Sequence, residues 1–252
     1  MTTKEALFEY TIRRADDGLI LGHRLSEWCG YGPILEEDIA LTNLALDLIG
    51  QATSFYQYAG KIEGKGRTED DLAFLRIERE YKNVLLVEQT NGDFGKTIVR
   101  QFFFDHFQRL LFERLVESKD EQISAIADKS LKEIKYHLRH SSEWVIRLGD
   151  GTEESHQRVQ ESVNDLFRFT SELFYQDEVD QVLIKEGVAF DTSDFRDEYD
   201  NNIKAVLNEA TLKLPEEKWQ LSGGRKGVHS EHLGFLLAEL QYMQRTYPGM
   251  EW

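Results

Sequence analysis

The 252-residue chain has one cysteine, Cys29, and no long apolar run. A single cysteine excludes a disulfide framework within the chain, and it excludes zinc or iron–sulfur sites built from several thiolates. No apolar segment reaches the length needed to span a bilayer, and the first residues lack the charged and apolar regions of a signal peptide. We therefore expect a cytoplasmic protein that has no membrane partner.

Basic residues are scarce relative to acidic ones. The sequence contains 30 lysines and arginines against 46 aspartates and glutamates, which gives a formal net charge of −16. Nucleic acids and anionic membranes would be repelled by most of such a surface, so we expect no nucleic-acid partner. A local basic pocket remains compatible with this overall charge.

Proline is also rare, with three residues at Pro33, Pro215 and Pro248. Between them, apolar residues recur at spacings of three and four, which is typical of helices rather than strands. One such stripe covers 123–148 and ends at a Gly-Asp-Gly sequence, and a second covers 41–59. Further helices are predicted over 4–29, 70–86, 94–117, 153–174, 195–212 and 230–247.

These segments predict an all-α protein. Four of them, 4–29, 41–59, 94–117 and 123–148, are long enough to form a four-helix bundle, and the others would add helices around it. With 40% hydrophobic residues the chain can bury a large core. No linker or internal repeat suggests a second unit, so we expect one domain over 1–252.

A histidine on the buried stripe of the 123–148 helix suggests a metal site that has been lost. A dinuclear site in a four-helix bundle takes one acid from each of two helices and a Glu-x-x-His pair from each of the other two. The spacing of three places both groups of the pair on one helical face. Here His137 is present, but Ile134 stands where the glutamate would be.

Four sequence runs carry a resemblance to a known family. The runs are Leu25-Ser26-Glu27-Trp28-Cys29-Gly30, Leu86-Val87-Glu88-Gln89-Thr90-Asn91-Gly92-Asp93-Phe94, Lys135-Tyr136-His137-Leu138-Arg139 and Gly227-Val228-His229-Ser230-Glu231-His232-Leu233-Gly234. They resemble the C-type structural subunit of the bacterial phenylacetyl-CoA 1,2-epoxidases, and the similarity covers nearly the whole chain.

The resemblance implies a ferritin-like, non-catalytic structural subunit that acts in aerobic phenylacetate catabolism. Its expected partner is a homologous catalytic subunit, which carries a di-iron centre and binds the aromatic acyl-CoA substrate. The family's complete enzyme also has a small bridging subunit and a reductase that takes electrons from NADPH. This chain itself is expected to bind no cofactor and to supply no catalytic residue.

The resemblance also assigns the remnants of the metal site. Glu27, Asp105 and His137 are the ligand positions that remain, whereas Leu48, Gln51 and Ile134 replace ligands. Leucine and isoleucine donate nothing to a metal and glutamine offers a neutral amide, so two irons are not expected to bind.

Two interpretations of the three remaining residues stay open. In the first, His137 is hydrogen-bonded or ion-paired to Glu27 or Asp105 in a buried polar network, which avoids an unpaired buried charge. In the second, the chain is a metalloenzyme in its own right that holds a single divalent ion on Glu27, Asp105 and His137, because two acids and one histidine form a known ligand set for mononuclear iron.

Three other motifs have weaker functional interpretations. The one Glu-x-x-His sequence, at 153–156, is better explained as a helix N-terminus, where acids are favoured. His229 and His232 have metal-binding spacing, but no second ligand pair accompanies them. In the glycine-rich loop 223–227, Arg225 and Lys226 could contact the phosphates of coenzyme A or an acidic partner. The alternative is a solvated connector.

Overall fold

The computed structural model describes residues 1–216 and 219–250, and it contains helices but no strand within these ranges. The all-α prediction is confirmed. The α-helices are α1 (Thr3–Ser26), α2 (Leu35–Glu63), α3 (Glu69–Phe74), α4 (Leu85–Glu88), α5 (Phe94–Leu115), α6 (Glu121–Gly149), α7 (Glu153–Leu166), α8 (Glu178–Glu186), α9 (Arg196–Glu209), α10 (Glu231–Leu240) and α11 (Tyr242–Thr246). Short 3-10 helices are η1 (Glu78–Glu80), η2 (Phe167–Phe174), η3 (Thr192–Phe195) and η4 (Gly224–Lys226).

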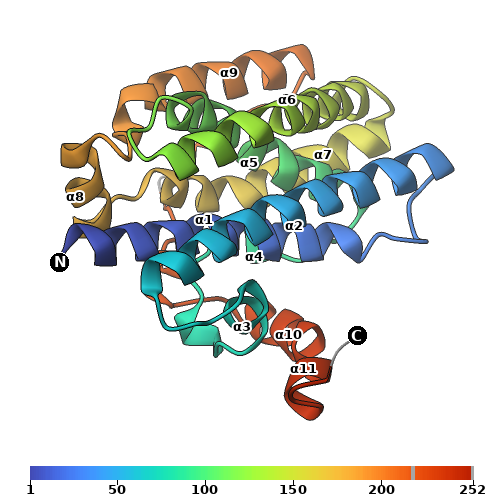
Figure 1. Ribbon diagram of the computed structural model, residues 1–252. Coiled ribbons are helices and arrows are strands. Elements are labelled where there is room, and N and C mark those ends of the chain that lie inside the picture. Colours follow the sequence, from blue (N-terminus) through green and yellow to red (C-terminus); the bar gives the residue numbers. More distant parts are fainter. Residues whose placement is uncertain (217–218, 251–252) are drawn as a thin grey trace.

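The four longest helices form a bundle (Figure 1). Helix α1 packs along α2, α5 packs along α6, and α2 joins the two pairs by contacting α6. Helices α7 and α9 lie against α5 and α6, while α8 lies against α1. The expected bundle of four long helices, with additional helices around it, is confirmed.

Two glycines allow α1 and α2 to approach closely. A Cβ atom at Gly18 would lie 3.0 Å from the Leu48 carbonyl oxygen, and one at Gly22 would lie 3.1 Å from the Ala45 carbonyl oxygen. The spacing of four places both glycines on the α1 face that meets α2. Each of these two glycines therefore has a clear packing reason.

The predicted helix termini near Gly149 are confirmed. Helix α6 ends at Gly149, and α7 begins after Thr152, whose hydroxyl accepts a hydrogen bond from the Ser155 amide at 3.2 Å. His156 places Nδ1 2.7 Å from the Gly149 carbonyl oxygen, so its ring joins the two helix ends. The segment 153–156 is a helix start, as the sequence indicates.

The prediction of a continuous helix over 70–86 is wrong. The chain instead forms α3, η1 and α4, separated by extended residues. Buried Asp16 of α1 accounts for the break, because it accepts hydrogen bonds from Arg76 Nη1 at 3.0 Å and from the Lys82 amide at 2.7 Å. A backbone amide that donates to a side chain on another helix cannot also donate to the carbonyl four residues earlier in a regular helix. Tertiary contacts therefore override the local helix propensity.

Other predicted segments differ in smaller ways. The 153–174 helix becomes α7 followed by η2, and the 230–247 helix is divided into α10 and α11 around Gln241. Helix α8 was not predicted. Together α3, η1, α10 and α11 form an appendage on one side of the bundle (Figure 1). Among the described residues, no helix combines the length and hydropathy needed to cross a membrane.

Candidate functional site

Asp105 lies in the bundle core on α5 and is 2% exposed. Its carboxylate accepts hydrogen bonds from Gln101 Nε2 at 2.6 Å and from Ser141 Oγ at 2.8 Å. Burial raises the pKa of Asp105 to about 6, although the nearby His137 ring and the two hydrogen bonds act in the opposite direction. Since burial disfavours the charged form, keeping the Asp105 carboxylate ionised in the core destabilises the folded state.

His137 is buried on α6, and its ring is paired with an acid that was not predicted. Nε2 lies 3.0 Å from Oδ2 of Asp47, a half-buried residue of α2. One turn later on α6, His140 Nε2 lies 2.8 Å from Glu37 Oε2, also on α2. The interpretation that His137 is hydrogen-bonded or ion-paired to Glu27 or Asp105 is therefore wrong in its direct partner, which is Asp47, although the charge of the His137 ring still lowers the pKa of Asp105. The two histidine–acid pairs join α6 to α2.

Glu27 is not part of this cluster. It is the exposed residue that follows α1, and its carboxylate binds Arg24 Nη1 and Asn91 Nδ2, each at 2.8 Å. Within residues 1–216 and 219–250, no group of three or more histidine, cysteine, aspartate or glutamate residues could hold a metal ion. The structure thus does not bring together Glu27, Asp105 and His137, as the single-metal interpretation requires.

The three positions that replace ligands are buried. Leu48 and Ile134 are core side chains, and the buried Gln51 has an Nε2 without a hydrogen-bond partner among the described residues. An iron site needs several oxygen or nitrogen donors that can carry the charge of the ion. The hydrocarbon side chains offer none, and both oxygens of Asp105 are already hydrogen-bonded, so this donor set does not fit a di-iron centre.

Arg225 is a structural residue, which corrects the prediction that it contacts a phosphate or a partner. Its guanidinium is 4% exposed and donates to both carboxylate oxygens of Asp17, from Nη1 at 2.9 Å and from Nη2 at 2.7 Å. Nη1 also donates to the Lys82 carbonyl oxygen at 2.7 Å. The neighbouring Lys226 is exposed, with its Nζ 5.3 Å from the centre of the Tyr175 ring.

His229 is also used by the fold rather than by a metal. Nδ1 lies 2.8 Å from Glu88 Oε2, and Nε2 lies 2.9 Å from the Tyr81 carbonyl oxygen. Glu88 additionally accepts hydrogen bonds from the amide and hydroxyl of Ser230, the residue that precedes α10. Both ring nitrogens of His229 are engaged, so the pair with His232 does not form a metal site.

The wild type is expected to lose stability as the pH rises, and His229→Gln should remove the part of this loss that comes from the titration of His229. Burial lowers the pKa of His229, but Glu88 and the Tyr81 carbonyl outweigh burial and raise it overall. A raised folded-state pKa gives stabilisation that is complete below the unfolded value of about 6.5 and disappears as the pH rises through the folded value. Urea unfolding of both proteins from pH 5 to 9 measures this. A constant difference in the free energy of unfolding across this range would contradict it.

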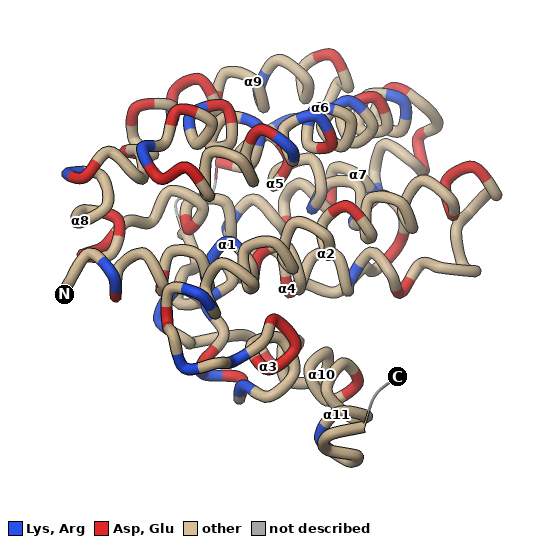
Figure 2. Tube along the Cα trace, in the orientation of Figure 1, with Lys and Arg blue, Asp and Glu red and all other residues tan. Residues whose placement is uncertain are grey.

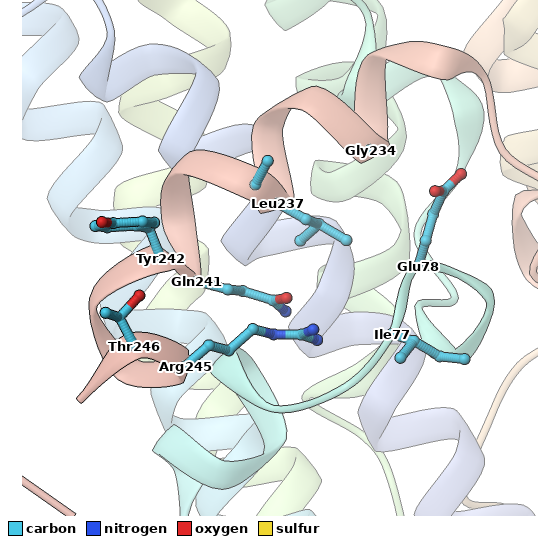
Figure 3. A pocket seen from close by; sticks show the side chains of 9 residues that line it. Ile77, Glu78, Gly234, Leu237, Gln241, Tyr242, Arg245 and Thr246 are labelled. Atoms are coloured by element: carbon cyan, nitrogen blue, oxygen red, sulfur yellow. The ribbon is translucent and has the colours of Figure 1, made fainter. Parts of the chain in front are cut away.

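A hollow on the appendage is separate from the buried cluster (Figure 3). It lies between η1 and the α10–α11 segment, and its polar side chains hold these elements together. Gln241 Nε2 donates to the Arg76 carbonyl oxygen at 3.0 Å, and Arg245 Nη2 donates to the same oxygen at 2.9 Å. These two hydrogen bonds join the α10–α11 segment to the residues that precede η1.

Three members of the buried cluster were missed from the sequence. Gln101 precedes Asp105 by one helical turn, and Ser141 follows His137 by one turn, so the spacing of four could have identified both. Asp47 adjoins Leu48 on α2, but its pairing with His137 depends on how α2 and α6 meet. No local sequence signal contains that information.

Comparisons with known proteins place the chain in a family. The family described as phenylacetic acid catabolic protein matches residues 1–252. The chain belongs to this family. In addition, the C-type subunit of 1,2-phenylacetyl-CoA epoxidase from Escherichia coli (strain K12) is 51% identical over 246 residues, which cover 98% of this chain and 99% of that protein. The resemblance noted from the four sequence runs is thereby confirmed.

Proposed function

We propose that this chain is the non-catalytic structural subunit of a phenylacetyl-CoA 1,2-epoxidase. It docks on the homologous di-iron subunit, supports that subunit's ligand-bearing helices, and acts in the cytoplasm during aerobic phenylacetate catabolism. The iron, the aromatic acyl-CoA and the chemistry belong to the catalytic partner. A small bridging subunit and an NADPH-dependent reductase complete the proposed assembly.

The buried cluster around Asp105 is the observation that carries the proposal. The Asp105 carboxylate accepts hydrogen bonds from Gln101 and Ser141, and the His137 ring pairs with the Asp47 carboxylate. At two of the positions that replace ligands, the buried side chains of Leu48 and Ile134 are hydrocarbon. Such a core can keep four helices in a fixed arrangement, but it has no set of donors for a redox metal.

The extent of the similarity is the second support. The E. coli relative is named as a subunit of the epoxidase, and the two chains match over almost their entire lengths. A rigid bundle that has lost its chemistry retains a large surface on which a related bundle can dock. Pairing with the catalytic subunit would explain why such a bundle is maintained.

Reconstitution of turnover tests the proposal. Purified catalytic subunit, bridging subunit and reductase should show acyl-CoA-dependent oxygen uptake only when this chain is added. The variants Asp105→Asn and His137→Gln should then sustain turnover within about twofold of the wild type once the complex has formed, because neither side chain touches a reacting atom. Loss of turnover by either variant in a fully formed complex would show that the chain takes part in the chemistry.

A further inference from the structure

The ring of His229 lies between two hydrogen-bond acceptors at the start of the appendage. Its Nδ1 is 2.8 Å from Glu88 Oε2, and its Nε2 is 2.9 Å from the Tyr81 carbonyl oxygen. The side chains of His229 and Glu88 are both 0% exposed, so bulk water reaches neither of them. A neutral imidazole carries one N–H and the imidazolium carries two. Satisfying both contacts therefore takes one proton more than a neutral ring beside an ionised carboxylate would hold.

The hydrogen bonds of Glu88 place that proton on the histidine. Besides the ring, the Glu88 carboxylate accepts from Asn83 Nδ2 at 2.9 Å, from the Ser230 amide at 2.6 Å and from the Ser230 hydroxyl at 2.8 Å. Donors aimed at a carboxylate favour its ionised form. The buried pair is therefore an imidazolium and a carboxylate.

This pair fixes the first turn of α10 to the rest of the chain. Glu88 is the last residue of α4, whereas Ser230 immediately precedes α10. A serine at that position commonly caps its own helix, but the Ser230 hydroxyl donates to Glu88 instead. Arg24 of α1 adds one contact nearby, from Nη2 to the His232 carbonyl oxygen at 3.0 Å. The start of α10 is thus held mainly through the Glu88 carboxylate.

The α10–α11 segment lies beside the bundle rather than within it (Figure 1). Helix α10 packs chiefly on η1 and α11, with Leu233 and Leu237 buried. Beyond α10, Gln241 and Arg245 bind the Arg76 carbonyl oxygen, which also belongs to the appendage side of the chain. Segments that share few contacts with the main core open locally at a lower free energy than the whole domain. The α10–α11 segment is such a unit.

Few charged residues lie on α10 and α11 (Figure 2). Histidine is the residue type that titrates near neutral pH, and the range 229–250 contains two, His229 and His232. On α1, Asp16 adds a negative charge that favours the protonated ring of His229. His23, also on α1, interacts with the charge of Glu239 on α10, but burial lowers the pKa of His23 below 6.5. His23 therefore titrates at lower pH than His229 does.

We propose that the His229–Glu88 pair is a proton-controlled latch: the imidazolium holds the start of α10 on α4, and loss of its proton releases the α10–α11 segment while the bundle stays folded. A neutral ring would turn one lone pair toward the carboxylate or the Tyr81 carbonyl, at 2.8 or 2.9 Å. The hydrogen bonds from Glu88 and Tyr81 raise the pKa of His229 above 6.5. The latch is therefore closed below that pH and opens as the pH rises through the raised value. It acts independently of any partner subunit.

Nitrogen chemical shifts of the His229 ring test the charge of the latch. The full chain, labelled with ¹⁵N at histidine, should show both ring nitrogens of His229 bearing hydrogen at pH 6, and one of them losing it as the pH rises to 9. The His229→Gln spectrum assigns the signal. A ring with one N–H at pH 6 would overturn the proposal.

Hydrogen exchange of the full chain from pH 6 to 9, corrected for the intrinsic rate at each pH, tests the release. Peptides from 231–246 should lose protection by about tenfold or more, the change expected when a charge-assisted hydrogen bond is lost. Peptides from α5 are the internal reference and should keep their protection. Equal changes in both would show a global loss of stability and no latch, and unchanged exchange in 231–246 would show that the segment is held by other contacts.

Variants identify the titrating group. In Glu88→Gln the side-chain amide can donate to a neutral Nδ1 while Nε2–H donates to Tyr81, so the pH dependence of exchange in 231–246 should disappear. His229→Gln covers the case in which Glu88→Gln does not fold, and it should raise exchange in 231–246 already at pH 6, with no further change up to pH 9. His232→Gln is the matched control and should behave as the wild type does. A pH dependence that survives His229→Gln, or that His232→Gln removes, would contradict the latch.

Discussion

Arg225→Met is expected to lower the free energy of unfolding by about 2–4 kcal/mol, because it removes the closer of the two guanidinium groups that face a buried carboxylate. Asp17 is buried on α1, and it receives two hydrogen bonds from Arg225 and one from the Val84 amide, the latter at 2.9 Å. Arg14 Nη2 remains 3.5 Å from Asp17 Oδ2, and methionine retains much of the apolar volume of the side chain, so the expected loss arises from the two missing hydrogen bonds and the weaker charge pairing. Urea unfolding at pH 7 measures it.

Lys226→Met is the matched control for this prediction. Lys226 is the next residue in the same glycine-rich loop, but it is exposed and interacts with the face of a tyrosine ring. Its replacement should change the free energy of unfolding by less than about 0.5–1 kcal/mol. Equal effects of the two substitutions would show that Arg225 is not the buried anchor that joins the loop to α1.

Asp105→Asn is expected to stabilise the protein at neutral and alkaline pH by about 1–3 kcal/mol. Burial raises the pKa of Asp105 from 3.8 to about 6, which means that the folded state binds this proton more tightly than the unfolded state. The stability of the wild type should therefore fall as the pH rises from about 4 to about 6, and the penalty should be complete above that range. Asparagine carries no charge and escapes the penalty.

The asparagine also suits the surrounding hydrogen bonds. Gln101 now points its Nε2 at Asp105, whereas its Oε1 is buried without a partner among the described residues. Rotation of the Gln101 amide brings Oε1 to the new amide N–H, while the new amide oxygen accepts from Ser141. Asp128→Asn, at an exposed position of α6, is the control and should change stability by less than about 0.5 kcal/mol. The free energy of unfolding of Asp105→Asn and of the wild type should be measured from pH 4 to 8. A stability gain of Asp105→Asn that grows with pH is the expected result. A loss of stability at pH 8 would show that the Asp105 charge is needed by the fold.

The long helices could be predicted from the sequence because their apolar periodicity is a local property. Helices α5 and α6 match their predicted segments to within two residues at either end, and α2 contains its predicted segment. The segment 70–86 could not be predicted in this way, because buried Asp16 on a distant helix captures Arg76 and the Lys82 amide. The prediction of one domain over 1–252 stays a prediction.

The candidate site was predictable in its chemical character but not in its pairings. Asp105 and His137 lie on the buried faces of their helices, and both are buried polar residues of the bundle. Glu27 was placed in the site by its position in a family motif, yet α1 ends before it and its carboxylate turns to Arg24 and Asn91. The glycine-rich sequence around Arg225 is typical of a solvated loop, and the contact of Arg225 with Asp17 depends on how the loop packs on α1.

The iron content of the isolated chain tests the central claim most directly. The purified protein should be loaded with ferrous iron under anaerobic conditions, desalted and analysed, first alone and then in complex with the catalytic subunit. We expect almost no iron in the isolated chain, and iron in the complex that is carried by the partner. Stoichiometric iron in the isolated chain that is lost on His137→Ala would contradict the claim that this bundle no longer holds a metal.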